Sequence, residues 1–379
     1  MKHIIFLKKD LNAQGGLEKY SFLLAKAFQK SGLKVTFLTA SQEPLINDFN
    51  AISLPCKSRL NFIKLKQFDL KCQEWINKNQ CDIVFGLDRN FFQTHYRAGN
   101  GVHAEFIKIR SQTESFLKKI SILINPMHRL ILKMERETYT GIYTQRIFTN
   151  SLMVKKEIAT HYKQSNPDKI KVVHNGVEWK DIQNNFEEWT SQKIIKAKEF
   201  GLNPNLHQLL FIGHGFKRKG LWQLLEALKI LEDKKWQLSV VGKDREIYKF
   251  RKWVSKNHLQ DRVIFWGARK DSISFYQIAD TTIIPSLYDP FANVTVESLA
   301  MGVYVITSEK NGGKEVINDY NGIVVDVYSP KNFAKTISKR ICQHKDIDGS
   351  TKIRNSVKHL DFSIQLNKIV QETVNSIGA

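Results

Sequence analysis

The chain has 379 residues, of which 42% are hydrophobic and 11% aromatic, a globular composition that excludes an intrinsically disordered protein and is long enough for two domains. No apolar run reaches the about 18 residues that a membrane-spanning helix needs. Lysine and arginine number 58 against 37 acidic residues, and the net charge of +21 indicates an anionic partner: a nucleic acid, an anionic membrane or a phosphorylated substrate.

The N-terminus, MKHIIFLKK, has the basic start of a secretory signal. Its apolar core runs only from Ile4 to Leu7 before Lys8, which is too short for a signal and predicts a first β-strand. Without export, the cysteines are expected to be reduced thiols and the protein cytoplasmic. None of them has the spacing of a metal site; they are Cys56, Cys72, Cys81 and Cys342.

Strand-like and helix-like patterns alternate through the first half of the chain. GGLEKYSFLLAKAFQKSG carries an apolar stripe at helical spacing, and Gly32 marks the end of that helix. Asn150 or Ser151 is expected to cap a helix over 152–162. The predicted strands of this half are HIIFLK (3–8), KVTFLTA (34–40), CDIVFGLD (81–88), RIFTN (146–150) and KIKVVHNGV (169–177).

The second half repeats the same alternation. GLWQLLEALKIL (220–231) has the apolar period of a helix and follows directly on a strand and a glycine-rich loop. The predicted strands of this half are HQLLFIGHG (207–215), WQLSVVGKD (236–244), RVIFWG (262–267), TTIIPS (281–286), VYVITS (303–308) and GIVVDV (322–327).

Strands alternating with helices, twice over, predict an α/β chain with two doubly wound, Rossmann-like domains and parallel sheets. A turn signal at Asn175-Gly176 gives an N-terminal domain over 1–174 and a C-terminal domain over 175–360. A last helix over 361–379 is expected to pack back on the N-terminal domain. Such sheets bind ligands at the carboxyl ends of their strands, so a cleft between two facing domains is the expected site.

Two glycine-containing loops follow predicted strands. Gly15 and Gly16 precede the first helix, where free N–H groups suit a phosphate, although such a pair more often marks a simple turn. In GHGFKRKG, the cations Lys217, Arg218 and Lys219 crowd the loop after the strand LLFI. They form either a solvated basic turn or a site for an anion.

The stretch DPFANVTVESLAMG follows the strand TTIIPS, and a helix is expected to begin in it near Asn293 or Val294. The backbone amides at that helix start would present a further anion site. Asp289 lies just before the helix and Glu297 one turn inside it. Acids near a helix N-terminus also stabilise the helix itself, so capping and ligand binding both remain open for each carboxylate.

His103 lies in the glycine-flanked loop RAGNGVHAEF, after the short segment FFQTHY. A lone histidine is more often structural than catalytic, but in a cleft it can transfer protons, and both interpretations remain open. No DxD-type pair of acids follows a strand. The sequence therefore predicts no metal and no other cofactor.

The segment 107–136 combines basic and apolar residues at near-helical spacing, interrupted by Pro126. Such a pattern suits the surface of an anionic bilayer. An ordinary amphipathic helix packed in the first domain explains it as well. The basic residues of the segment are Lys108, Arg110, Lys118, Lys119, Arg129, Lys133 and Arg136.

Together, the stretches QGGLEK, VHNGVEW, FIGHGFKRKG, VIFWGARKD and DPFANVTVE resemble glycosyltransferase family 4, the retaining nucleotide-sugar transferases of GT-B fold. Their order and spacing cover essentially the whole chain. RAGNGVHAEF and NPMHRLILKMERETY resemble the branch of the family that contains lipopolysaccharide core glucosyltransferase I. The resemblance implies two doubly wound domains that face each other across a cleft.

The resemblance also implies site residues. Charge on the leaving diphosphate would be neutralised by Arg218 and Lys219, sugar hydroxyls would be bound by Asp289, and ribose hydroxyls by Glu297. The implied catalytic residues are Arg218, Lys219, Asp289 and His103. The implied donor-binding residues are Gly15, Gly16, Asn100, Gly267, Ala268, Arg269, Ala292, Asn293, Val294 and Glu297.

Two positions depart from the family pattern. The first acid is usually Glu and here is Asp289, which is one methylene shorter and would alter how the sugar is held. The position after the strand glycine is often Arg and here is His214, so a cation is lost and Arg218 and Lys219 carry more of the charge.

The resemblance implies transfer of a hexose, with glucose from UDP-glucose as the expected donor, to a lipid-linked or lipopolysaccharide-core acceptor. The enzyme would be cytoplasmic and peripheral on the inner membrane face, held to anionic lipid through 107–136. Another family 4 hexosyltransferase of capsule, O-antigen or glycolipid synthesis is the alternative, as is a catalytically silent relative. A nucleic-acid-binding protein is a distant alternative; no nucleic acid is expected, because the basic residues are spread out and no recognition motif is present.

Overall fold

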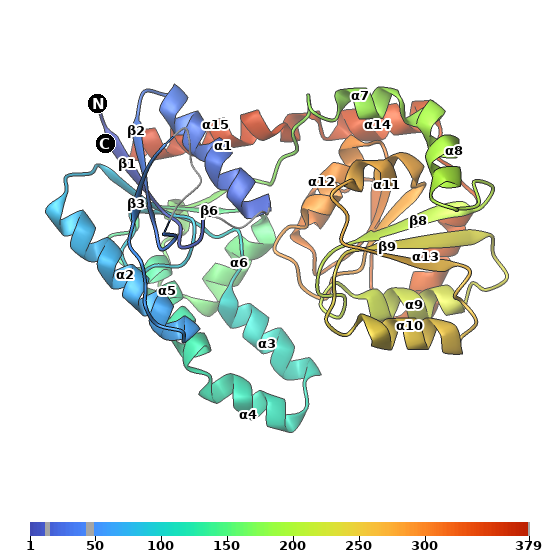
Figure 1. Ribbon diagram of the computed structural model, residues 1–379, viewed down its shortest axis with the longest axis horizontal. Coiled ribbons are helices and arrows are strands. Elements are labelled where there is room, and N and C mark those ends of the chain that lie inside the picture. The colour runs from blue at the N-terminus through green and yellow to red at the C-terminus, as the bar shows by residue number, and fades with distance from the viewer. Residues whose placement is uncertain (12–15, 43–48, 378–379) are drawn as a thin grey trace. The chain divides into compact units, whose positions relative to one another are not determined.

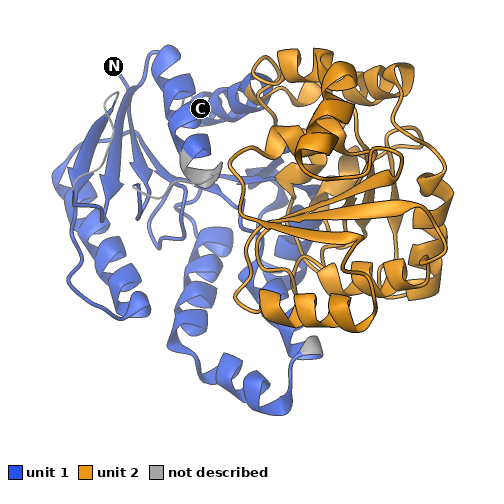
Figure 2. Cartoon of the chain, turned by 45° about the vertical axis from the view of Figure 1, so that its right-hand side comes forward, with its two compact units in different colours: residues 1–174, 363–379 blue, residues 175–362 orange. Residues whose placement is uncertain are grey.

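The computed structural model describes residues 1–11, 16–42 and 49–377. The chain divides into two compact units (Figure 2). Unit 1 comprises 1–174 together with 363–379, and unit 2 comprises 175–362. Among the described residues, no helix is both long enough and apolar enough to cross a bilayer.

Unit 1 is built on a seven-stranded parallel sheet with the order β3-β2-β1-β4-β5-β6-β7 (Figure 1). Its strands are β1 (His3–Leu7), β2 (Lys34–Thr39), β3 (Asn50–Ser53), β4 (Ile83–Gly86), β5 (His95–Arg97), β6 (Arg146–Thr149) and β7 (Ile170–Val172). Its helices are α1 (Gly16–Lys30), α2 (Asn61–Lys78), α3 (His103–Thr113), α4 (Phe116–Ile124), α5 (Pro126–Thr140), α6 (Leu152–His161) and α15 (Phe362–Ser376).

Aromatic side chains fill the centre of unit 1. The ring of Phe6 on β1 lies 5.2 Å from that of Phe37 on β2, 5.3 Å from Phe85 on β4 and 5.8 Å from Phe28 on α1, between ring centroids. All four rings are fully buried. Burial on both faces explains why the strands of a parallel sheet read as continuous apolar runs, which is the pattern that predicted them.

The C-terminal helix α15 belongs to unit 1 with the exception of its first residue. Nε2 of His95 on β5 lies 2.8 Å from Oγ of Ser376. The carboxylate of Glu372 lies 3.8 Å from Arg146 and 3.7 Å from Lys171, on β6 and β7. The chain therefore returns to its first sheet after unit 2 is complete.

Unit 2 is built on a six-stranded parallel sheet with the order β10-β9-β8-β11-β12-β13. Its strands are β8 (His207–Ile212), β9 (Trp236–Val241), β10 (Val263–Gly267), β11 (Thr281–Ile284), β12 (Tyr304–Ser308) and β13 (Gly322–Val325). Its helices are α7 (Gln183–Glu187), α8 (Trp189–Glu199), α9 (Leu221–Lys229), α10 (Ile247–Lys256), α11 (Ser272–Ile278), α12 (Asn293–Ala300), α13 (Pro330–Ile341) and α14 (Ile347–Ser356).

Both sheets are doubly wound, as the sequence predicted. In each, the strand order reverses beside the first strand, between β1 and β4 in unit 1 and between β8 and β11 in unit 2. This reversal parts the loops that follow the two central strands and makes their carboxyl ends the favoured ligand site of such a fold.

Two strands of unit 1 were not recognised in the sequence. β3 lies at the sheet edge and is only partly buried, so its four residues carry no apolar run. β5 has the polar sequence HYR, although His95 and Tyr96 are buried. The cap that the sequence left open between two residues is Ser151, whose hydroxyl accepts a hydrogen bond from the Val154 amide at 3.1 Å.

Candidate active site

The loops that follow β8 and β11 touch each other at the topological switch of unit 2. Gly220 has a φ of 79°, and a Cβ at this position would lie 1.9 Å from the carbonyl oxygen of Pro285. The amide of Leu287 donates to the carbonyl of Arg218 at 2.9 Å. Only glycine permits this approach, because a side chain would clash with the neighbouring backbone and strain its own.

This contact brings three of the predicted catalytic residues together. Lys219 forms an ion pair and hydrogen bond with the carboxylate of Asp289, and both side chains are largely buried, with exposures of 12% and 9%. A guanidinium nitrogen of Arg218 lies 3.5 Å from the same carboxylate and donates to the Tyr288 carbonyl at 2.9 Å. Arg218 remains 43% exposed. Two cations thus surround one acid, which leaves one positive charge in excess for an anionic ligand.

Asn311 orders the loop that carries Asp289. Its fully buried side chain accepts from the amides of Ala292 and Gly313, each at 3.0 Å, and donates to Thr295 and Thr307. Nothing in the sequence pointed to Asn311, because EKNGGK reads as an ordinary turn.

The N-terminus of α12 begins at Asn293, as predicted. The amide of Ala292 donates to the side chain of Asn311, so it is not the free donor that the sequence predicted. For the amides of Asn293 and Val294, the described part of the chain contains no acceptor. The side chain of Asn293 accepts from Asn175 at 2.7 Å. The two remaining amides are the donors that a phosphate could use at this helix end.

Glu297 lies half-buried on α12, one turn inside the helix, where it accepts from the hydroxyl of Tyr276 at 2.7 Å. Burial and the nearby Glu297 carboxylate raise the pKa of Tyr276 well above its usual value, so the phenol stays protonated and keeps donating. Tyr276, a residue the sequence did not point to, therefore orients Glu297.

Gly267, Ala268 and Arg269 follow the carboxyl end of β10, two strands from β8. Gly267 has a φ of 72°, which turns the chain out of the sheet. The guanidinium of Arg269 lies 5.6 Å from the ring centroid of Phe200. These residues share the edge of the sheet that carries Lys219 and Asp289.

The predicted site residues of unit 1 differ from one another in where the structure places them. Gly16 opens α1, and Gly15 lies outside the described residues. Asn100 is exposed in a turn. The prediction that His103 lies in a loop is wrong: it is the first residue of α3, and its backbone amide donates to Glu135 at 2.7 Å. The preceding glycines hid this helix start in the sequence.

The buried Glu135 and the partly buried Arg89 form an ion pair that the sequence did not predict. The Nε of Arg89 lies 3.1 Å from the Glu135 carboxylate, which also accepts from the hydroxyl of Tyr162 at 2.9 Å. Arg89 further donates to the carbonyl of Gly101 at 3.2 Å. The pair therefore holds both the turn before α3 and the amide of His103, from residues that lie 46 positions apart in the chain.

The imidazole of His103 is uncharged at neutral pH. Burial, reinforced by the positive charges of Arg89 and Arg110 and by His128, lowers its pKa from 6.5 to about 3. Its Nε2 lies 2.9 Å from Nδ1 of His128. A neutral ring can exchange hydrogen bonds with a sugar hydroxyl without adding charge.

We expect the stability of the protein to depend on pH through His103. Its folded pKa lies below the unfolded value of 6.5, so only the unfolded chain takes up this proton between pH 6.5 and about 3, and the contribution of His103 is lost as pH falls through that range. The loss is about 1.4 kcal/mol per pH unit. Urea unfolding at pH 6.5 and 5.5 should show a smaller decrease for His103→Gln than for the wild type.

Between pH 7 and 8 the two proteins should change in parallel, because His103 is neutral in both states there. Equal slopes of the two proteins below pH 6.5 would show that the folded protein also protonates His103.

Two family models match the chain. The model described as Glycosyltransferase Family 4 matches residues 14–179, and the model described as Glycosyl transferases group 1 matches residues 192–346. The first covers most of unit 1 and the second most of unit 2. The loops that carry Arg218, Lys219, Asp289 and Glu297 all lie within the second match.

Known relatives are similar along nearly the whole chain. An uncharacterized glycosyltransferase of Methanocaldococcus jannaschii is 25% identical over 95% of this chain and 93% of its own length. The lipopolysaccharide glucosyltransferase WaaG of Escherichia coli is 24% identical over 87% of each chain.

Solved structures have the same fold. The crystal structure of WaaG has a TM-score of 0.77, with 22% identity, and the match covers 97% of this chain and 98% of that one. HepE of Anabaena, solved in complex with UDP-glucose, has a TM-score of 0.68 at 14% identity over 99% of this chain and all of its own.

Proposed function

Because the chain belongs to the family 4 glycosyltransferases of GT-B fold, we propose that it is a retaining hexosyltransferase that uses UDP-glucose. The proposed acceptor is lipid-linked or a lipopolysaccharide core, reached at the inner face of the cytoplasmic membrane. The name of WaaG, a lipopolysaccharide glucosyltransferase, supports both the sugar and the acceptor. The complex of HepE with UDP-glucose supports the donor.

The observation that carries the proposal is the cluster of Arg218, Lys219 and Asp289. It lies at the carboxyl edge of the unit 2 sheet, beside the strand-order reversal at which doubly wound sheets bind nucleotides. The start of α12 contributes the amides of Asn293 and Val294 to the same loop. Fixed cations and amides are the groups that a diphosphate requires.

In the proposed reaction, the bond between the sugar and the diphosphate breaks ahead of attack by the acceptor. Negative charge grows on the leaving UDP, and Arg218 and Lys219 stabilise it because they are already in place and need no reorganisation. The acceptor hydroxyl attacks from the side that the diphosphate leaves, and a phosphate oxygen takes its proton. The configuration of the sugar is thereby retained.

The acids of the site are proposed to bind hydroxyls. Asp289 is held by Lys219 and accepts from hydroxyls of the donor sugar. Glu297, oriented by Tyr276, accepts from the ribose hydroxyls. Gly267 to Arg269 lie beside the base. The assignments rest on these positions at one sheet edge together with the family resemblance.

In unit 1, Gly15 and Gly16 are proposed to bring the start of α1 to the diphosphate, and Asn100 and His103 to contact the transferred sugar. The ion pair of Arg89 and Glu135 supports the last assignment, because it fixes the segment from Gly101 to His103. Fixed positions are what sugar recognition requires, since a hydroxyl is bound only in a narrow range of geometry.

Helix α4 supports the proposed contact with a membrane surface. Its large apolar side chains point into solvent, with exposures of 75% for Phe116, 77% for Leu117, 68% for Leu123 and 63% for Ile124. In Figure 1, α4 lies beyond α3, away from the sheet of unit 1. A cluster of exposed apolar groups of this kind marks an interaction surface.

Basic residues on α4 and α5 add positive charge to this apolar surface. Lys118, Arg129, Lys133 and Arg136 are exposed on α4 and the adjoining α5. The other interpretation of this segment, a helix packed in the domain, describes α5 instead, where Met134 and Tyr139 are buried. Exposed apolar groups with flanking cations suit insertion into the headgroup region of an anionic leaflet.

A thermal-shift panel tests the donor. We expect UDP-glucose, at about 100 times its dissociation constant, to raise the Tm by roughly 5–10 °C, and UDP-galactose, UDP-N-acetylglucosamine and GDP-mannose to raise it less. Glucose alone serves as the control. A larger shift with another nucleotide-sugar would select another family 4 hexosyltransferase, and no shift with any of them would contradict donor binding.

A further inference from the structure

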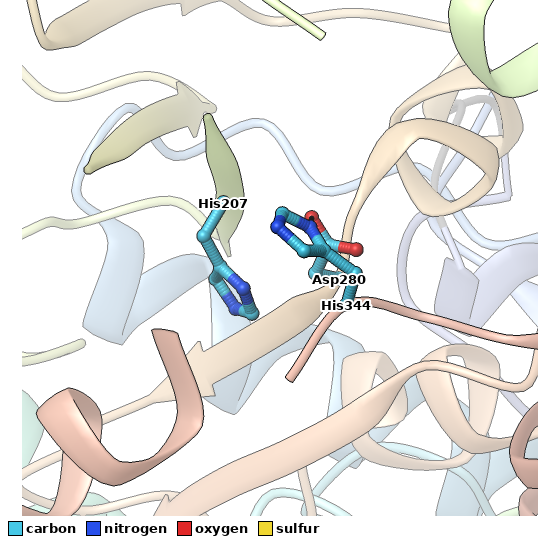
Figure 3. Close-up of side chains that lie close together, drawn as sticks. All are labelled: His207, Asp280 and His344. Carbon is cyan, nitrogen blue, oxygen red and sulfur yellow. Dashed lines mark ion pairs between the residues drawn. The ribbon is translucent and has the colours of Figure 1, made fainter. Parts of the chain in front are cut away.

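Three side chains with metal-binding groups meet at the amino-terminal ends of the central strands of unit 2. The Lys219–Asp289 pair lies at the opposite, carboxyl ends of these strands. His207 is the first residue of β8, Asp280 directly precedes β11, and His344 lies between α13 and α14. Figure 3 shows the two imidazole rings and the carboxylate gathered together. One ligand atom from each lies within 4.8 Å of the other two. No other group of this kind is present in residues 1–11, 16–42 and 49–377.

The carboxylate of Asp280 has a lone pair that is not used in a hydrogen bond. Its Oδ1 accepts from the amide of Lys345 at 2.8 Å and from the ammonium of Lys193, and its Oδ2 accepts from the amide of Gln208 at 2.8 Å. A carboxylate has about four lone-pair sites, so these three bonds leave one on Oδ2. The Nδ1 of His344 lies 3.5 Å from that oxygen, too far for a good hydrogen bond.

His207 contributes a second, independent observation. Its side chain is 1% exposed, and its Nδ1 is buried with no hydrogen-bond partner in the part of the chain that the structure describes. Its Nε2 lies 3.0 Å from the hydroxyl of Thr281. When Nε2 donates its proton to that hydroxyl, Nδ1 carries an unused lone pair on the ring that faces His344, 5.5 Å away between centroids. A buried polar atom left unpaired is uncommon and calls for a partner.

We propose that His207, Asp280 and His344 bind a divalent transition-metal ion of the zinc type. Two imidazoles and one carboxylate are ligands that suit Zn²⁺, and they disfavour Mg²⁺ or Ca²⁺, which prefer oxygen ligands. Bonds of about 2.1 Å in a tetrahedral site place ligand atoms about 3.4 Å apart. Rotation of His344, whose side chain is 53% exposed, can bring its ring nitrogen closer to His207 and Asp280.

The ammonium of Lys193 limits how tightly the ion is held. It already neutralises Asp280, so a divalent cation adds its charge to a pair that is neutral overall. The imidazole nitrogens must therefore supply most of the binding, which again favours Zn²⁺ over hard cations. The bound ion would join the segment around His344 to the starts of β8 and β11, so its role is structural and independent of sugar transfer.

Zinc binding by the untagged, chelator-treated full chain tests the proposal. Equilibrium dialysis should show one bound Zn²⁺ more per chain in the wild type than in His344→Ala. His258→Asn is the matched control, because His258 is also exposed and its φ of 56° suits asparagine. It should bind as the wild type does.

Two further measurements use the same proteins. Zn²⁺ at about 100 times its dissociation constant should raise the Tm of the wild type by roughly 5–10 °C and that of His344→Ala by much less, while Mg²⁺ should shift neither. Co²⁺ should give a visible absorption band that His344→Ala lacks. Equal zinc stoichiometry in the wild type and His344→Ala, with both proteins folded by circular dichroism, would overturn the proposal.

Discussion

Lys219→Met is expected to lower kcat by about 100- to 1,000-fold, the usual effect of removing one preorganised group that stabilises developing charge. Lys219 is the most buried cation of the cluster and is fixed by Asp289, so no reorganisation is required when the diphosphate takes up charge. Methionine is the sharpest replacement, because the carbons of the lysine side chain pack against Gly213 and methionine retains that stem. Charge is then the main property removed.

The measurement is the rate of UDP release from UDP-glucose, which needs no knowledge of the acceptor. Lys217→Met is the matched control: it lies in the same loop, is exposed and removes the same charge, and its rate should stay within a few-fold of the wild type. Thermal unfolding shows whether Lys219→Met remains folded, since the variant removes the ion pair of Lys219 with Asp289. A folded Lys219→Met protein with wild-type turnover would remove the cluster from the mechanism.

The double change Leu117→Glu and Leu123→Glu on α4 is expected to weaken binding to anionic vesicles by about 100-fold or more. Burying a leucine side chain stabilises by about 1.5–3 kcal/mol, so the loss of two corresponds to at least about 3 kcal/mol. The new carboxylates are also repelled by an anionic lipid surface. Because both leucines are exposed in the folded chain, the change should leave its stability intact.

Co-sedimentation with vesicles of phosphatidylglycerol and phosphatidylethanolamine measures this effect. Ile230→Glu provides the control, because Ile230 is a half-exposed apolar residue of unit 2 that lies outside the α4 surface. UDP release by the double variant should match that of the wild type. Vesicle binding that is unaffected by the double change would exclude α4 as the membrane contact.

Most of the sheet architecture could be read from local pattern. β1, β2, β8, β9 and β12 are apolar runs between turn signals, and parallel strands covered on both faces require such runs. Strands that lack an apolar run cannot be predicted from this pattern. The edge strand β3 and the polar strand β5 were missed for this reason. The start of α3 at His103 was missed because glycines precede it and because its N-terminal amide is held by Glu135, which lies 32 positions away.

The candidate site also contains residues that the sequence predicted and residues that it did not. The loops with Lys219 and Asp289 could be recognised because each follows a predicted strand and carries charge. Their pairing across 70 positions depends on β8 and β11 being neighbours in the sheet. Asn311, Tyr276 and the pair of Arg89 and Glu135 had no signal at all, because each acts on a residue distant in sequence.

The sequence alone determined the alternation of strands and helices and the chemical groups at the strand ends, since both follow from residue order over a few positions. Only the tertiary structure decided which of those groups meet. The strand order placed Lys219 against Asp289 at the carboxyl ends of the unit 2 strands. It placed His207 beside Asp280 and His344 at the amino-terminal ends. Contacts of this kind join residues 64 or more positions apart along the chain, and no local pattern encodes them.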